Sequence, residues 1–337
     1  MIVQVHHPTP PNILKEAEAF LLALDLKCRT VITPDSTLFV VYAGQLPDPR
    51  RIRQCPGVKD VHHISDNFKL VSSQWKQGRS TVHVGEVPFG PDDFHMIMGP
   101  CSVENEDQLE AVAQFLVSQG VRMIRGGVFK PRSSPYSFRG LGLEGLDLFR
   151  NVANRHGLGI VTEVMEVAQI DAMAPKVDVF QIGARNMQNF NLLEAVGKSG
   201  RPVLLKRSMS GTIEEFLQCA EYIYNVGNER ILLCERGIRT FEGAYRNTFD
   251  VNAISYLRSR SHLPVLADPS HGVGLRRHVV DIGLGAVAAG ADGLLVEIHP
   301  RPDAAVSDRD QTLYFDQAAT LIEGSRQFRA LRSTMAL

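Results

Sequence analysis

The feature that most constrains the fold is a regular alternation of strand-like and helix-like segments from His95 almost to the C-terminus. Short apolar runs predict strands at 95–98, 121–125, 159–163, 177–182, 202–206, 230–234, 264–267 and 292–296. Helical spacing of apolar residues predicts helices at about 106–119, 143–156, 166–173, 189–198, 211–225, 248–259, 276–289 and 310–328. Eight such units are typical of a closed (β/α)8 TIM barrel.

A doubly wound open sheet is the alternative architecture. It usually has fewer units, and its first turn carries a glycine-rich phosphate-binding sequence. Neither GxGxxG nor GxxxxGK[ST] occurs in this chain. The pattern therefore favours the barrel.

The first seventy residues form a separate pattern that predicts a small α+β unit. A strand at 2–5 precedes a helix in which apolar residues recur at helical spacing from Ile13 to Leu24. Strands at 28–33 and 37–42, a short helix at 47–55 and a strand at 58–64 complete the order β-α-β-β-α-β, which is that of a ferredoxin-like fold. We expect one face of its sheet to be open and able to pair between subunits.

These patterns divide the chain into three parts. Residues 1–70 are predicted to be the ferredoxin-like unit, residues 71–92 a linker with a hairpin around 82–89, and residues 93–337 the barrel. A formal net charge of -1 gives no reason to expect binding to nucleic acid or an anionic membrane. The chain also shows no signal peptide and no apolar run of membrane-spanning length. Its five scattered cysteines predict reduced thiols in the cytoplasm.

Polar residues follow the predicted strands and would therefore gather at the C-terminal face of the barrel, where TIM-barrel enzymes place their active sites. One subset is cationic and predicts binding of more than one anionic group, because arginine and lysine suit phosphate and carboxylate. Its members are Arg125, Lys130, Arg132, Arg185, Lys206 and Arg236.

A second subset from the same face carries metal-ligating side chains. Sulfur, nitrogen and oxygen donors together favour a divalent transition metal such as Mn2+, Fe2+, Co2+ or Zn2+. The members are Cys101, His271, Glu297 and Asp308.

Several long motifs in the same order resemble the 3-deoxy-D-arabino-heptulosonate-7-phosphate (DAHP) synthases, in particular their type Iβ subgroup with an N-terminal ferredoxin-like domain. The strings are MIMGPCSVEN, IRGGVFKPRSSPYSFRGLG, QIGARNMQNFNLL, LLKRSMSGTIEEFL, CERGIRTFE, LADPSHGVG and LLVEIHP followed by SDRDQTL. The chain has Ser133 where the family often has threonine, and Ser208 where it often has glycine.

The resemblance implies condensation of phosphoenolpyruvate with erythrose 4-phosphate, the first step of the shikimate pathway. It implies metal binding by the four residues named above, with Lys130, Cys101 and His271 as catalytic residues. Contacts to phosphoenolpyruvate would come from Arg125, Lys130, Glu163, Ala184, Arg185, Lys206 and Arg236, and Asp268 is a further expected substrate contact. The phosphate of the aldehyde substrate would lie near Arg132 and Ser133.

Two alternatives stay open at this point. A 3-deoxy-octulosonate 8-phosphate synthase uses the same barrel with arabinose 5-phosphate, but such enzymes tend to have Ala-Asn-Arg-Ser where this chain has residues 130–133, Lys-Pro-Arg-Ser. A non-catalytic amino-acid sensor would have no need of the metal and cation positions. We further expect residues 1–70 to respond to tyrosine or phenylalanine, and the protein to form a homotetramer or homodimer.

Overall fold

The N-terminal part of the chain folds as a small antiparallel sheet with two helices on one side. The structure is a computed structural model that describes residues 1–76, 78–130, 136 and 138–335. The sheet has the order β2-β3-β1-β4, and its elements follow the predicted β-α-β-β-α-β sequence, with the second helix shortened to one turn. The elements are β1 (Ile2–Val5), α1 (Pro11–Ala23), β2 (Lys27–Ile32), β3 (Thr37–Ala43), α2 (Pro49–Ile52) and β4 (Val58–His62).

Both faces of this sheet are covered within the chain. Side chains alternate between the faces, so Val3 and Phe39 pack with Leu21 of α1, whereas Ile2 and Leu38 join the large apolar cluster of the barrel. The second face was expected to be open for pairing between subunits, and that expectation is wrong. The segment after β4 occupies it: Ile64, Phe68 and Leu70 belong to the same large cluster.

The segment from Ile64 to Ser80 is anchored to the barrel by polar contacts as well. The partly buried carboxylate of Glu221 accepts hydrogen bonds from the backbone N–H groups of residues 69, 70 and 71 at 2.9, 2.8 and 3.1 Å. His262 is 1% exposed and lies between Leu70 and Ser80, with Nε2 2.9 Å from the Leu70 carbonyl and Nδ1 2.8 Å from the Ser80 hydroxyl. This segment therefore packs as part of the barrel.

A hairpin of β5 (Val82–Val84) and β6 (Val87–Phe89) closes the N-terminal end of the barrel. Its valines and Phe89 form one apolar cluster with residues from the barrel strands, among them Ile97, Leu204 and Leu232. Because these strand residues are fully buried, the hairpin fills the end of the barrel with side chains and leaves only the opposite end as a mouth.

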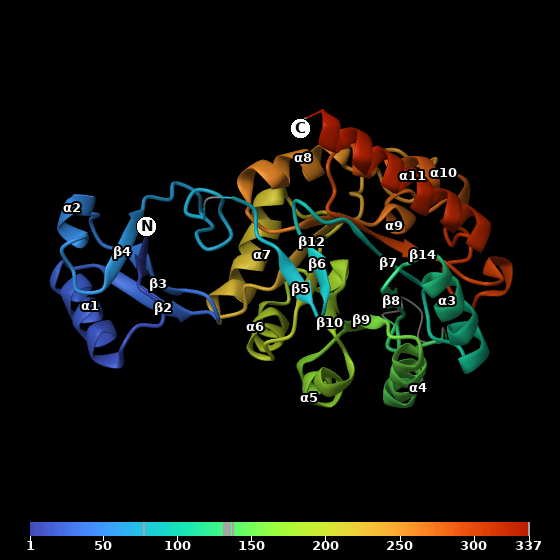
Figure 1. The fold of residues 1–337 in the computed structure, drawn as a ribbon, viewed down its shortest axis with the longest axis horizontal. Coiled ribbons are helices and arrows are strands. Elements are labelled where there is room, and N and C mark those ends of the chain that lie inside the picture. The colour runs from blue at the N-terminus through green and yellow to red at the C-terminus, as the bar shows by residue number, and fades with distance from the viewer. Residues whose placement is uncertain (77, 131–135, 137, 336–337) are drawn as a thin grey trace.

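Eight parallel strands form a closed barrel, and helices surround it, as the sequence predicts. In Figure 1 the small sheet lies at one end of the long axis, and the barrel with its helices makes up the rest. The strands are β7 (His95–Gly99), β8 (Met123–Arg125), β9 (Gly159–Val164), β10 (Val179–Ile182), β11 (Val203–Lys206), β12 (Ile231–Glu235), β13 (Val265–Ala267) and β14 (Gly293–Glu297).

The helices match the predicted segments with three differences. The third segment is broken into α5 (Ile170–Met173) and two 3-10 turns, the last helix starts later than expected, and a short helix, α9 (Pro269–Val273), follows β13. The others are α3 (Glu106–Ser118), α4 (Gly142–Arg155), α6 (Phe190–Lys198), α7 (Ile213–Asn225), α8 (Val251–Arg260), α10 (Arg276–Ala288) and α11 (Phe315–Thr334).

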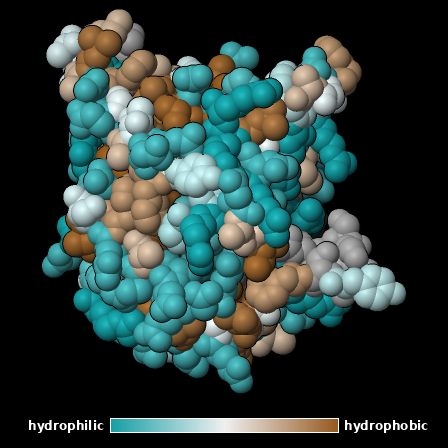
Figure 2. Space-filling model, turned by 90° about the vertical axis from the view of Figure 1, so that its right-hand side faces the viewer, coloured by the Kyte–Doolittle hydropathy of each residue, from teal (hydrophilic) through white to brown (hydrophobic). Residues whose placement is uncertain are grey.

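The surface is mainly polar where Figure 2 shows it. Hydrophilic residues cover most of that face, and the apolar residues on it form separate small patches. Among the described residues, none of the helices combines the length and the hydropathy that crossing a bilayer requires.

Candidate active site

The candidate site lies at the C-terminal ends of the barrel strands. Cys101 follows β7, Arg125 ends β8 and Glu297 ends β14. His271 is carried by α9, directly after β13, and Asp308 lies in the connection from β14 to α11. Because β14 and β7 are neighbours that close the barrel, the residues at their ends meet although they are far apart in the sequence.

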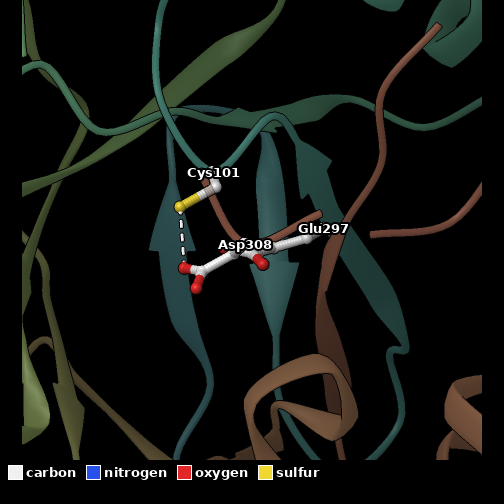
Figure 3. A group of neighbouring side chains, drawn as sticks. All are labelled: Cys101, Glu297 and Asp308. Atoms are coloured by element: carbon white, nitrogen blue, oxygen red, sulfur yellow. Dashed lines mark hydrogen bonds between the residues drawn. The ribbon is translucent and has the colours of Figure 1, made fainter. Parts of the chain in front are cut away.

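Three of the four predicted metal ligands form one compact group. The ligand atoms of Cys101, Glu297 and Asp308 all lie within 4.8 Å of one another. The Cys101 thiol donates a hydrogen bond to Asp308 Oδ2 at 3.0 Å, and the three side chains point toward one another (Figure 3). A sulfur and two carboxylates therefore converge on one point at the mouth.

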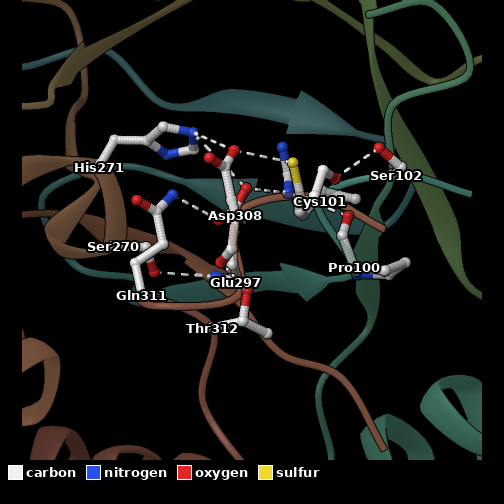
Figure 4. A network of polar contacts seen from close by, with 12 residues as sticks. Pro100, Cys101, Ser102, Ser270, His271, Glu297, Asp308, Gln311 and Thr312 are labelled. Atoms are coloured by element: carbon white, nitrogen blue, oxygen red, sulfur yellow. Dashed lines mark hydrogen bonds and ion pairs between the residues drawn. The ribbon is translucent and has the colours of Figure 1, made fainter. Parts of the chain in front are cut away.

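His271 stands at the edge of this group. Its Nε2 is 3.5 Å from Glu297 Oε1 and 4.0 Å from Asp308 Oδ2 (Figure 4). Asp268 fixes the residue from the other side, because its carboxylate accepts the His271 backbone N–H at 2.9 Å and lies 2.8 Å from Nδ1. Since Asp268 is also the N-cap of α9, the helix start itself directs Nε2 toward the acidic group.

The charge states in the group follow from burial and from its neighbours. Burial, reinforced by Glu297, raises the pKa of the Cys101 thiol to about 11. Burial also lowers the pKa of His271, and Asp268 offsets only part of this effect. For Asp308 and Glu297 burial acts in the opposite direction, but His271 and nearby cations outweigh it and lower the pKa of both carboxyls. Two carboxylates, a neutral imidazole and a protonated thiol result.

Two residues that the sequence analysis did not select connect the acidic group. Arg246 Nη1 lies 3.3 Å from Asp308 Oδ1 and donates to Gln311 Oε1 at 2.6 Å. Gln311 in turn donates to Glu297 Oε2 at 2.6 Å. Gln311 lies within the string SDRDQTL and Arg246 lies four residues after CERGIRTFE, but nothing in their spacing indicates that their side chains reach the same carboxylates.

The cations of the mouth differ in their partners. Arg125 is buried and donates to Glu297 Oε1 at 2.8 Å, while Lys130 donates to Cys101 Sγ at 3.0 Å. Lys206 lies 2.5 Å from Asp268 Oδ2. Arg236 is 4% exposed, and this burial lowers the pKa of its guanidinium. No carboxylate among the described residues lies within ion-pair distance of Arg236. Arg236 is thus the buried cation best able to receive an anion.

Other predicted site residues lie around this centre with different degrees of exposure. Arg185 is exposed, and Ala184 and Glu163 are partly buried. Gly183 allows the backbone to approach Glu163, because a Cβ there would be 2.0 Å from Glu163 Oε1. Arg132 and Ser133 lie outside the described residues.

Arg207 and Glu235 also follow strands on this face, but they bind each other. Arg207 Nη1 is 2.9 Å from Glu235 Oε2 and 2.9 Å from Asp250 Oδ2. Glu235 additionally accepts the backbone N–H of Gly237 at 2.6 Å. These groups hold the loop after β12 in place, and the carboxylate of Glu235 has little remaining capacity for a ligand.

The donor set fits a divalent transition metal. A buried thiol would have to lose its proton to act as a ligand, and a pKa of about 11 means that only a strong positive charge nearby would achieve this at neutral pH. The two adjacent carboxylates supply the negative charge that a divalent ion needs. A neutral imidazole at the edge completes a mixed sulfur, nitrogen and oxygen set.

The fold and the site define a (β/α)8-barrel enzyme with a candidate metal centre and several cations at one mouth. The sequence profile of the DAHP synthetase I family matches residues 70–332, and the chain belongs to this family. Its members' reaction is the synthesis of DAHP at the start of the shikimate pathway, which is therefore the reaction class of this chain.

Individual relatives agree with this assignment. The chain is 47% identical over 317 residues to phospho-2-dehydro-3-deoxyheptonate aldolase of Thermotoga maritima, covering 93% of this chain and 91% of the relative. The crystal structure of that enzyme from T. maritima, titled DAHP synthase, has a TM-score of 0.78 at 39% identity and covers 98% of this chain and 97% of its own. A truncated form of the T. maritima synthase has a TM-score of 0.74 at 43% identity and covers 78% of this chain and 97% of its own.

The octulosonate 8-phosphate enzymes, the alternative named above, are less similar in sequence to this chain. A 2-dehydro-3-deoxyphosphooctonate aldolase from Syntrophobacter fumaroxidans is 33% identical over 253 residues, or 69% of this chain and 86% of the relative. The similarity to the heptonate enzyme is higher and extends over more of the chain, which favours the assignment as a DAHP synthase.

Proposed function

We propose that the barrel mouth condenses phosphoenolpyruvate with erythrose 4-phosphate at a divalent metal held by Cys101, His271, Glu297 and Asp308. The observation that carries this proposal is the convergence of the thiol and the two carboxylates within 4.8 Å of one another, beside Arg125 and Lys130. A thiol, two carboxylates and an imidazole form a donor set for Mn2+, Fe2+, Co2+ or Zn2+.

The buried cations are the proposed binding site for phosphoenolpyruvate. Arg236 has no carboxylate at ion-pair distance among the described residues, so its guanidinium is available to a phosphate or carboxylate. We propose Lys206, which lies 2.5 Å from Asp268 Oδ2, as a second buried cation of this site, and the partly buried Ala184 and the exposed Arg185 as further contacts. Glu163 faces the Gly183 backbone and would orient the substrate rather than attract it.

The bond changes proceed as follows. The C2=C3 π electron pair of phosphoenolpyruvate forms a bond from C3 to the aldehyde carbon and leaves positive charge at C2, while the π electron pair of the aldehyde C=O bond moves to its oxygen. When bound, the metal supplies Lewis acidity that polarises this aldehyde. Lys130 gives a proton to the new hydroxyl oxygen. Water then adds at C2 and loses a proton, and the tetrahedral carbon expels inorganic phosphate to leave the ketone. The mouth cations stabilise the charge on the departing phosphate.

The metal requirement is tested by substitution of Cys101 and by chelation. Chelator treatment of the wild-type enzyme is expected to abolish phosphate release, and added Mn2+ is expected to restore it. Cys101→Ala is expected to lose at least about 100-fold in turnover and most of its bound metal, because one of four ligands is removed. Cys28→Ala, which changes a half-buried thiol in β2 distant from the mouth, is the control. Full activity of chelated Cys101→Ala enzyme would refute the metal proposal.

The aldehyde is tested by comparing two sugar phosphates. Lys130 and the Pro-Arg-Ser that follows it in the sequence favour the shorter erythrose 4-phosphate, since a lysine is longer and a proline more rigid than the Ala-Asn pair of the octulosonate enzymes. Phosphate release should therefore be at least about 100-fold more efficient with erythrose 4-phosphate than with arabinose 5-phosphate. Comparable kcat/KM values for the two sugars would exclude this substrate assignment while leaving the metal proposal intact.

Regulation and assembly complete the proposal. We infer that tyrosine or phenylalanine inhibits the enzyme through its N-terminal unit, and that the chain forms a homotetramer or homodimer in the cytoplasm. A cavity of about 870 Å3 between the small sheet and α7 supports the first inference, because Arg29, Glu18 and Lys69 around it could hold an amino acid by both its charges. The absence of disulfides among the five cysteines supports a reducing compartment.

A further inference from the structure

A cavity of about 640 Å3 lies at the N-terminal end of the barrel, on the side opposite to the mouth. The loop before β7 forms one wall of it, and the last turns of α8 and α11 form the others. Four of the lining residues are arginines: Arg258, Arg326, Arg329 and Arg332. A single carboxylate, that of the exposed Asp92, lines the same cavity.

Two of these guanidinium groups converge above Gly290. A Cβ at this glycine would be 1.7 Å from Arg258 Nη1 and 2.9 Å from Arg332 Nη2. Gly290 has a φ of +102°, a backbone conformation that favours glycine. A larger residue would also collide with the two guanidinium groups. Like charges do not converge in this way unless something between or beside them is negative.

The protein itself supplies only part of that negative charge. Arg258 donates to the Gly290 carbonyl and Arg332 to the Ala288 carbonyl, both at 2.6 Å, and Arg329 donates to the Pro91 carbonyl. These carbonyls include the C-terminal end of α10, where the helix dipole amounts to roughly half a negative charge. Three guanidiniums therefore face about half a charge, one exposed carboxylate and the more distant Asp292, which already pairs with Arg79.

The described carboxylates near the cavity are mostly engaged elsewhere. Arg79 donates to Asp292 Oδ1 at 2.7 Å, and Arg326 has Glu323 at 3.8 Å. Among the described residues, no carboxylate lies within 4.0 Å of Arg258, Arg329 or Arg332. Burial and repulsion from neighbouring arginines, Arg79 first among them, lower the pKa of Arg258 to about 10.

We propose that this arginine cavity is a binding site for a small phosphate-type dianion, separate from the active site. Each guanidinium has five N–H donors and uses only one or two of them on carbonyls, so several donors remain for an oxyanion. A dianion matches the charge that the cavity leaves uncompensated, and a hollow of this size favours a small molecule over an extended polyanion.

The experiment measures binding of radiolabelled inorganic phosphate by equilibrium dialysis at constant ionic strength. Because the mouth is itself expected to bind phosphate, the readout is the difference between proteins. Wild-type enzyme and the control Arg277→Gln, which changes an exposed arginine of α10, are expected to bind one more phosphate per chain than Arg329→Gln/Arg332→Gln. Sulfate should displace this phosphate, and chloride at equal ionic strength should not.

Two further measurements separate binding from folding and from catalysis. The double variant should keep the kcat and the KM of both substrates in phosphate-free buffer, which shows that the mouth is intact. If the double substitution prevents folding, Arg329→Gln alone is used, because its partner is a loop carbonyl, and it should weaken the extra site about tenfold. Equal phosphate stoichiometry and affinity in wild-type and variant proteins would overturn the proposal, whatever the metal and substrate tests give.

Discussion

Arg246 links two of the proposed metal ligands although it belongs to neither of their segments. It comes from the loop after β12 and contacts Asp308 directly and Glu297 through Gln311. Asp308 has a positive φ of 51°, which is uncommon for a residue with a side chain, so its backbone needs support from such contacts. The geometry of the acidic group thus depends on a loop that contributes no ligand.

Replacing Arg246 should weaken metal binding without removing a ligand. Arg246→Gln cannot ion-pair with Asp308, so that carboxylate loses one of the contacts that orient it. We expect about 10- to 100-fold weaker metal affinity, with most of the turnover recovered at saturating metal. The measurement is a metal titration of the metal-free enzyme, followed by activity and by bound metal.

The control for this prediction is Arg239→Gln, which changes an exposed arginine of the same loop. Its metal affinity should equal that of the wild type. An Arg246→Gln enzyme that binds metal as tightly as the wild type would show that Asp308 is held by its own segment.

The sequence predicted the positions of those site residues that lie at the ends of barrel strands. Cys101 and Glu297 meet because each lies at the end of a strand and these strands are adjacent, which follows from the order of a closed barrel. The role of Arg246 could not be predicted, because it depends on the path of an irregular loop. Arg207 and Glu235 also lie at strand ends on this face, but such a position alone does not reveal that the two opposite charges bind each other.

Among the elements, the segment from Ile64 to Ser80 has the most unexpected role. Its residues were assigned to the small unit up to residue 70 and to a linker from residue 71, yet Trp75 and Leu70 are buried with barrel residues. Its few apolar residues have no helical or alternating spacing, so periodicity could not reveal their burial. The strands and most helices, whose spacing is regular, were found close to their predicted bounds.

His262 makes the attachment of this segment sensitive to pH. Its Nε2–H donates to the Leu70 carbonyl, and in the neutral ring Nδ1 accepts from the Ser80 hydroxyl. Burial lowers the pKa of His262 to about 3. Because the unfolded chain binds a proton at about pH 6.5 and the folded chain does not, stability is lost as the pH falls from 6.5 toward 3.

The expected size of this effect is about 2 kcal/mol between pH 7 and pH 5. The measurement is urea unfolding at both pH values for the wild type and for His262→Gln. The variant should be less stable at pH 7 and should lose about 2 kcal/mol less on acidification. His278→Gln, at an exposed position in α10, should behave as the wild type does. Identical pH dependence in the wild type and His262→Gln would contradict the prediction.

For the whole molecule, the two folding units could be predicted, but the way they join could not. Strand order and helical spacing are local properties, whereas the packing of Ile2 and Leu38 onto the segment after β4 is not. Since that segment belongs to the barrel core, a cut after residue 70 would remove Ile64, Phe68 and Leu70 from it. A cut after His62, where β4 ends, keeps them.

Removing residues 1–62 should separate regulation from catalysis. The shortened enzyme should keep most of the turnover of the full chain, because none of the proposed site residues lies in the deleted part. Tyrosine and phenylalanine at millimolar concentration should inhibit the full-length enzyme and leave the shortened one unaffected. The measurement is phosphate release with both substrates at increasing amino-acid concentration.

Lysine at the same concentrations is the control ligand, and it should have no effect on either enzyme. If neither aromatic amino acid changes the rate of the full-length chain, the N-terminal unit has a structural role only. Inhibition that persists in the shortened enzyme would place the effector site on the barrel.

The hairpin of β5 and β6 has a kinetic consequence. Since the hairpin blocks the N-terminal end of the barrel, both substrates and both products must pass through the mouth at the C-terminal end. On the proposed substrate contacts, we expect phosphoenolpyruvate, which would reach the buried Lys206 and Arg236, to bind before the aldehyde near the rim, because a molecule already at the rim would obstruct it. The sugar product likewise occupies the mouth until it dissociates. The three valines and the phenylalanine that close this end therefore predict ordered binding of the substrates and ordered release of the products, although the hairpin itself lies far from the reacting groups.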